Sequence, residues 1–250
     1  MSRESLSVAA LSRPGRREVN EDAYGQCSVG SQWCSVLCDG AGGHGNGDVA
    51  AQRAVATILQ AFETEPRASP QRVAELIGLG DAAVLQAQRE VPAGSDMRTT
   101  IVVALVDTES GLAVWGHAGD SRLYRWRMGQ LLDHTRDHSV QRNLFDAGLV
   151  APGAAPEVSR SVLSSALGSP DGCDVDVVDA PLPLQDGDVL LLCSDGLWDT
   201  LDADTLTRSL NAVPSAPAWL AALDTAVRDS ASPTQDNYTA IALWWEARLG

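Results

Sequence analysis

Two kinds of apolar pattern follow one another along the chain. Short continuous apolar runs, each stopped by glycine or a charged residue, are typical of strands that are buried on both faces. Longer stretches rich in Ala and Leu repeat with the period of an α-helix. The runs predict strands at 6–12, 22–29, 33–39, 99–107, 112–119, 121–127, 188–196 and 237–245, and the periodic stretches predict helices at 46–64, 70–90, 138–147, 202–211 and 216–230.

The order of these elements indicates the fold class. Strands come in consecutive runs and do not alternate with helices, which favours an α+β layered domain over a doubly wound parallel sheet. The chain contains no internal repeat and no linker long enough to divide it. We therefore expect a single domain over residues 1–250, with its core at about 6–245.

Composition excludes several kinds of chemistry. All 18 basic residues are arginine, so lysine is absent. This excludes a Walker-type phosphate loop, Schiff-base or pyridoxal chemistry, and a protein kinase. The formal net charge of −15 argues against nucleic acid or an anionic membrane surface as a partner, because both attract a cationic face. An excess of acid favours metal cations or basic partners instead.

Cysteine spacing and hydropathy bear on the compartment. The five cysteines form no Cys-x-x-Cys pair, so we expect reduced, mostly buried thiols rather than a zinc knuckle or a disulfide framework. No apolar run approaches the roughly 20 residues that span a bilayer, and the first residues lack a signal-peptide core. A cytoplasmic protein without membrane insertion is expected.

Five aspartates stand where an apolar strand stops, usually with glycine beside them. Oxygen ligands on rigid strand ends suit hard divalent ions, and glycine lets a backbone carbonyl approach such an ion. Each Asp-Gly pair alone is first of all a turn signal. Converging carboxylates repel one another, so these side chains either lie far apart or hold metal. They are Asp22, Asp39, Asp120, Asp195 and Asp236.

Arginine supplies the second candidate component. Arg17, next to Arg16, precedes Glu21 and Asp22 by four and five residues. A guanidinium fork matches phosphate with two hydrogen bonds, as a phosphoryl-transfer site beside two metal ions would require. The alternative is a surface salt bridge from Arg17 to Glu18 or Glu21.

Other catalytic motifs fail in their context. The GAGGHG stretch at 40–45 fits a dinucleotide fingerprint, but the helix after it leads to another helix and Asp39 would face the pyrophosphate. No cysteine has arginine six positions later, as a cysteine-dependent phosphatase needs. An aspartyl-phosphate phosphatase normally employs a lysine. A serine hydrolase built on Ser121 would use Asp137 and His138, whose adjacency on one segment does not make a relay.

Six ordered blocks resemble a known family. They are RREVNEDAYG, CDGAGGHG, HAGDSRLYRW, LDHTRDHS, LLCSDGLWD and TQDNYTAIAL. In this order and spacing they are similar to the metal-dependent serine/threonine protein phosphatases of the PPM (type 2C) family, in the short bacterial form. The resemblance implies a four-layer α-β-β-α sandwich, with two antiparallel sheets packed face to face, helices outside, and a two-metal centre at one end.

The resemblance also implies roles for single residues. Two or three Mn²⁺ or Mg²⁺ ions would be bound, and a shared water would attack phosphorus in line. Arg17 would hold the substrate phosphate, and Glu21 would act through bound water. Asp39 would bridge two ions, while Asp120 with Asp195 would match the weaker third site of bacterial members. The ligands of the two-metal centre would be Asp22, Asp39, Asp195 and Asp236, with the carbonyl of Gly40.

Departures from the family pattern concern the leaving group and the flap. Ala41 stands where animal members carry a histidine proposed as general acid, and His44 is either a substitute or a capping residue of the next helix. Arg98 replaces the usual glycine, and the stretch 151–168 lacks the usual His-Pro and downstream Arg. Substrate specificity therefore does not follow from the relatives.

The resemblance predicts a monomeric phosphatase that acts on phosphoserine and phosphothreonine of proteins and opposes a bacterial Ser/Thr kinase. One alternative is an inactive phosphatase-like module that binds phosphoproteins. Another is a phosphatase confined to a switch pathway, such as anti-sigma-factor antagonists or a secretion apparatus. We expect His117 and His134 to be structural, and the acidic stretch 171–179 to be solvated, with weak metal binding as the other reading.

Overall fold

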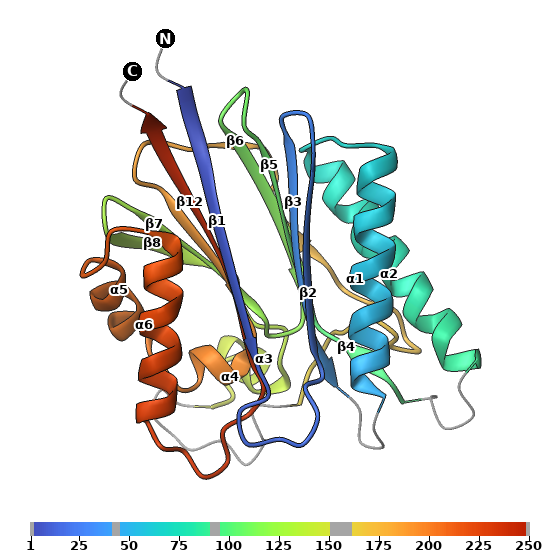
Figure 1. Cartoon of the computed structure of the whole chain (residues 1–250). Coiled ribbons are helices and arrows are strands. Elements are labelled where there is room, and N and C mark those ends of the chain that lie inside the picture. Colours follow the sequence, from blue (N-terminus) through green and yellow to red (C-terminus); the bar gives the residue numbers. More distant parts are fainter. Residues whose placement is uncertain (1–2, 42–45, 91–95, 151–161, 249–250) are drawn as a thin grey trace.

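The computed structural model describes residues 3–41, 46–90, 96–150 and 162–248. Two antiparallel sheets lie face to face in it (Figure 1). The first sheet has the order β1 (Arg3–Arg13), β12 (Tyr238–Arg248), β11 (Val189–Cys193), β7 (Arg122–Arg127) and β8 (Gln130–His134). The second has the order β10 (Leu182–Pro183), β6 (Leu112–Ala118), β5 (Ile101–Asp107), β3 (Gln32–Ala41) and β2 (Asp22–Val29), with β4 (Arg98–Thr99) beside β3 and β9 (Asp176–Val177) beside β6.

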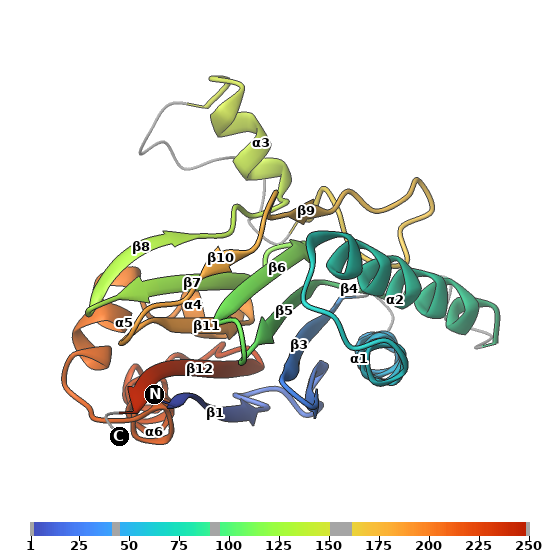
Figure 2. The ribbon, with the colours of Figure 1, turned by 90° about the horizontal axis from the view of Figure 1, so that it is seen from above.

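Helices cover the outer face of each sheet. The second sheet carries α1 (Gly47–Thr64) and α2 (Pro70–Glu90), and the first carries α5 (Ala203–Leu210) and α6 (Ala216–Asp229) (Figure 1). Two short helices lie outside these layers: α4 (Asp195–Trp198) follows β11, and α3 (Val140–Asp146) projects from the body (Figure 2). The predicted four-layer α+β sandwich is confirmed.

The continuous apolar runs have a simple explanation in this layering. Along β5, Val102, Ala104 and Val106 face the other sheet, while the residues between them pack against the helices. In β11, Leu190 and Leu192 likewise lie between the sheets, and their neighbours face α5 and α6. A strand with helix on one side and sheet on the other is apolar at every position, because successive side chains point to opposite faces.

The predicted long elements are present, with differences at their ends. The strand expected at 188–196 stops at Cys193, because Asp195 begins a helix of its own. The strand expected at 99–107 is divided into β4 and β5. The short strands β8, β9 and β10 were not predicted, since they have few residues and no apolar period. Among the described residues, no helix is long and apolar enough to cross a membrane.

Candidate active site

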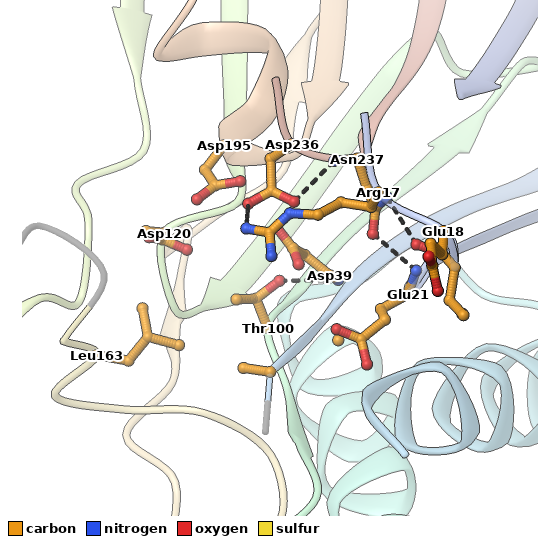
Figure 3. A pocket seen from close by; sticks show the side chains of 13 residues that line it. Arg17, Glu18, Glu21, Asp39, Thr100, Asp120, Leu163, Asp195, Asp236 and Asn237 are labelled. Carbon is orange, nitrogen blue, oxygen red and sulfur yellow. Dashed lines mark hydrogen bonds and ion pairs between the residues drawn. The ribbon is translucent and has the colours of Figure 1, made fainter. Parts of the chain in front are cut away.

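One end of the two sheets encloses a cavity of about 380 Å³ (Figure 3). Its wall comes from segments far apart in the chain: the loop before β2, the end of β3, the corner after β6, the start of α4 and the residues before β12. Every predicted site residue except Asp22 lines it. The lining residues are Arg17, Glu18, Val19, Glu21, Asp39, Gly40, Ala41, Thr100, Asp120, Leu163, Asp195, Asp236 and Asn237.

Asp39 is fixed through its backbone near the end of β3. Its N–H donates to Thr100 Oγ1 (3.0 Å), and its carbonyl accepts from the Thr100 N–H (2.9 Å) and from the Thr99 hydroxyl (2.9 Å). A Cβ on the next residue, Gly40, would collide with the backbone of Gly47. Only glycine permits this close approach of β3 to the start of α1, so the local sequence fixes where the Asp39 carboxyl lies.

Asp22 lies behind the cavity wall. It is the first residue of β2, not the end of a strand as predicted, and it stands opposite Asp39 in the β2–β3 register. Its Oδ2 accepts a hydrogen bond from Ser194 Oγ (2.8 Å), which in turn accepts one from the Thr239 N–H (2.9 Å). Its Oδ1 is buried and has no hydrogen-bond partner among the described residues.

Asn237 fastens the loop that carries Arg17 to the start of β12. Its side-chain amide donates to the carbonyls of Pro14 (2.9 Å) and Val19 (3.0 Å), and its Oδ1 accepts from the Glu21 N–H (2.8 Å). Asn237 was not among the site residues predicted from the sequence. Its place directly after a candidate ligand, in the block TQDNYTAIAL, was the available signal.

Arg17 is the cation at the edge of the cavity. Its Nη2 donates to Asp236 Oδ2 at 2.8 Å (Figure 3). Neither Glu18 nor Glu21 forms an ion pair with it in the described part of the chain, unlike the surface salt bridge considered from the sequence. The Arg17 side chain is 60% exposed, so its guanidinium can turn toward an incoming anion.

The acids raise one another's pKa. Burial raises the pKa of Asp39 well above its usual range, and the charges of Asp22, Asp195 and Asp120 raise it further. The pKa of Asp22 rises to about 7, first through burial and then through nearby carboxylates, although hydrogen bonds from hydroxyls oppose the rise. Without cations, protons therefore neutralise this site.

Asp120 is placed at the corner after β6. Burial, followed by the charges of Asp195 and Asp137, raises its pKa to about 7. The Asp120 carbonyl accepts from Trp198 Nε1 (2.9 Å), which ties the corner to α4. Burial also raises the pKa of Asp195. The predicted partners of a third metal site are therefore electrostatically coupled across the cavity.

The donor set fits hard divalent cations. It consists of carboxylate and carbonyl oxygens, one of which, Asp22 Oδ1, is buried without a partner. The acids do not close around a single point, since no three described carboxylates here offer oxygens within 4.8 Å of one another. Asp236 forms an ion pair with Arg17, and the charge of Asp195 raises the pKa of Asp39. The acid side chains are therefore spread over the wall of an open cavity.

Two predicted features lie outside the described residues. His44, considered as a source of the leaving-group proton, belongs to the range 42–45. Most of the expected flap stretch belongs to 151–161. The described part of that stretch contributes Leu163 to the cavity wall, next to Ala41.

Comparison with known proteins identifies the family. Residues 12–229 match the model of the protein phosphatase 2C family. The serine/threonine protein phosphatase PstP of Mycobacterium tuberculosis is 30% identical over 213 residues, which cover 84% of this chain and 40% of PstP. The serine/threonine phosphatase stp of Listeria welshimeri is 33% identical over 189 residues, which cover 72% of this chain and 73% of that protein. This chain belongs to the protein phosphatase 2C family.

A solved structure agrees with this assignment. The catalytic domain of PstP in complex with two manganese ions superposes with a TM-score of 0.80 at 27% identity, covering 97% of this chain and 99% of that one. The chain spans only 40% of the length of the mycobacterial relative PstP. Its likeness to PstP therefore concerns the catalytic domain.

Proposed function

We propose that this protein is a divalent-metal-dependent phosphatase that hydrolyses phosphoserine and phosphothreonine on proteins. The observation that carries the proposal is the cavity of mutually repelling buried aspartates with one exposed arginine at its edge. Buried carboxylates whose pKa values are raised by one another require cations to ionise together at neutral pH. Membership of the protein phosphatase 2C family supports the same reading.

The acids divide by position around the cavity. Asp39, Asp195 and Asp236, with the Gly40 carbonyl, would hold two ions from the wall, and Asp22 would support them from behind. Asp120 would serve a weaker third site together with Asp195. When bound, Mn²⁺ or Mg²⁺ supplies an activated water at neutral pH and offsets the charge that develops on the phosphoryl group.

Arg17 is proposed to orient the phosphate. In the absence of substrate its guanidinium is bonded to Asp236, and its exposure leaves it free to exchange this carboxylate for a phosphate oxygen. A guanidinium can bind phosphate through two parallel N–H···O bonds. Asn237 supports this step by fixing the loop on both sides of Arg17.

Proton supply to the leaving Ser or Thr oxygen does not come from position 41, because alanine has no proton to give. Glu21 lines the cavity, and burial, then Asp48, raises its pKa. It therefore retains a proton at higher pH than an ordinary glutamate does. Glu21 is therefore a candidate source of this proton, whereas the family resemblance implied only that Glu21 acts through bound water.

Release of phosphate from a phosphothreonine peptide tests the proposal. We expect turnover with Mn²⁺ or Mg²⁺, none after chelation with EDTA, and loss of turnover in Asp195→Asn with the fold retained. Asp229→Asn is the matched control, because Asp229 is exposed at the end of α6, outside the cavity. Equal activity with and without EDTA would refute the metal-dependent mechanism.

A folded, metal-binding protein with no turnover on any phosphopeptide would support the alternative, an inactive module that binds phosphoproteins.

Four further expectations stay predictions: opposition to a bacterial Ser/Thr kinase, a cytoplasmic location, a monomeric state and a single domain. Comparing phosphoproteins of a strain that lacks the protein with those of its parent would identify the substrates.

A further inference from the structure

A second cluster of potential metal ligands lies at the root of α3. His117 is in β6, His138 lies two residues before the start of α3, and Asp176 is in β9. The β6–β9 register sets Asp176 opposite His117. His138 is held between the two through its backbone: its N–H donates to the Gly119 carbonyl (2.9 Å) and its carbonyl accepts from the Ser164 N–H (2.9 Å). Three separate segments thus meet at this point.

The geometry of the three side chains suits one ion. One ligand atom from each lies within 4.8 Å of the other two, and this is the only such group among the described residues. His138 Nε2 and Asp176 Oδ2 are 3.1 Å apart, and the two imidazole centroids are 4.6 Å apart. Two ligands of one first-row metal ion lie about 3 Å apart when each bond is about 2.1 Å, so small movements would complete the site.

The hydrogen bonds of His117 leave a ring nitrogen available. Its Nε2 lies 2.7 Å from the Arg136 carbonyl oxygen, which can only accept, so Nε2 carries the proton and Nδ1 carries the lone pair. A metal-bound histidine typically donates its other N–H to a carbonyl in this way. Burial also lowers the pKa of His117, which keeps the imidazole in the neutral form that metal ions bind.

One feature of His138 is not explained if the cluster has only a structural role. Its Nδ1 is buried and has no hydrogen-bond partner among the described residues. A buried polar atom without a partner costs free energy unless something else binds there. An ion bound at Nδ1 would supply the partner that this nitrogen lacks among the described residues.

We propose that His117, His138 and Asp176 form a separate site for a borderline transition-metal ion such as Zn²⁺. Two imidazoles and a carboxylate select such ions, whereas the oxygen-only cavity selects Mg²⁺ or Mn²⁺. The bound ion would join β6 and β9 to the segment that leads into α3. This links the position of α3 to metal supply, independently of the carboxylate cavity.

Titration with Zn²⁺ by calorimetry tests the site on the whole chain, with Mg²⁺ in excess. We expect a binding step whose affinity falls by at least about tenfold in Asp176→Asn and in His138→Ala. The matched controls are Asp174→Asn, an exposed acid two residues away, and His134→Ala, whose histidine bonds only to a neighbouring carbonyl. The Asp176 side chain is 65% exposed, so its substitution tests the site without endangering the fold.

Two further arms identify where the ion binds. The same titration is repeated on Asp195→Asn. A Zn²⁺-binding step whose affinity changes in this variant belongs to the carboxylate cavity, and a step that does not change belongs elsewhere. Co²⁺ in place of Zn²⁺ separates nitrogen ligands from thiolates, because thiolates give an intense charge-transfer band in the near ultraviolet. Unchanged affinity and stoichiometry in both Asp176→Asn and His138→Ala would overturn the proposal.

Discussion

The carboxylate cavity and the histidine cluster at the root of α3 differ in how far the chain's own side chains supply hydrogen-bond partners and counter-charges. In the cavity, several buried aspartates face one another with a single exposed arginine as counter-charge, and their pKa values rise. In the histidine cluster, His138 bonds to Asp176 and lowers the pKa of that carboxyl. The acids of the cavity are held together against charge repulsion, whereas the carboxyl of the cluster already has a hydrogen-bond partner.

This difference indicates which site depends on cations. Removing cations from the cavity leaves protons as the only means of neutralising its acids, so both activity and stability should respond strongly. Removing a metal from the histidine cluster leaves an ordinary hydrogen-bonded group.

The largest effect is expected from Asp39→Asn. Asparagine removes the carboxylate that contacts Asp195 but keeps the side-chain shape, so the fold should remain and kcat/KM on a phosphothreonine peptide should fall at least about 10³-fold. Circular dichroism checks the fold, and Asp229→Asn is the control. Activity within about tenfold of wild type would show that the cavity does not depend on the Asp39 carboxylate.

The stability of the metal-free protein should fall as pH rises. The folded pKa values of Asp22 and Asp120 are about 7, against 3.8 for the ordinary group, so the folded state binds more protons than the unfolded one between these values. Their contribution is present below about pH 4 and is lost as the pH rises through about 7. His117, whose pKa is lowered, acts in the opposite direction, but Asp39 and Asp195 add to the loss.

Urea denaturation in EDTA at about pH 5 and about pH 8 measures this effect, and the midpoint should be lower at the higher pH. Mn²⁺ should restore the midpoint at the higher pH, because cations bind the ionised acids. Asp120→Asn should flatten the dependence, since asparagine does not titrate. A midpoint that rises with pH in EDTA would remove the basis of the contrast between the two sites.

The sequence could predict which acids belong to the cavity, but not which of them line its wall and which lie behind it. Asp39, Asp195 and Asp236 were recognisable because each sits at a boundary of an apolar run. The position of Asp22 behind the wall depends on the β2–β3 register and on the hydroxyl of Ser194, which comes from a distant segment. Strand register and contacts between distant segments are set by tertiary packing, so a local sequence pattern does not predict them.

The histidine cluster shows the same limit more strongly. His117 was expected to be structural, and the acidic stretch that contains Asp176 to be solvated, because neither has a neighbour in the sequence that suggests a ligand pair. Their meeting depends on β9, a strand of two residues with no detectable period. By contrast, β5 and β11 were predictable because burial on both faces makes every position apolar.

A moderate effect is expected from Arg17→Ala. The exposed guanidinium would bind phosphate in the ground state, so KM for a phosphopeptide should rise about tenfold while kcat changes less. Arg17→Lys should recover only part of the loss, because an ammonium cannot make the two parallel bonds. Steady-state kinetics on the same peptide separate the two parameters. An unchanged KM would assign Arg17 to the Asp236 ion pair alone.

The smallest effect is expected from Asp176→Asn in EDTA. Its partner bond to His138 is 3.1 Å long and the Asp176 side chain is 65% exposed. Such pairs contribute at most about 1 kcal/mol, so Tm in EDTA should fall by no more than about 3 °C. In a separate assay with Mn²⁺, phosphatase activity should stay within about twofold of wild type. Asp174→Asn should leave Tm unchanged. If Asp176→Asn lowered Tm as much as the rise in pH does in EDTA, the histidine cluster would be no more self-sufficient than the carboxylate cavity, and the contrast between them would fail.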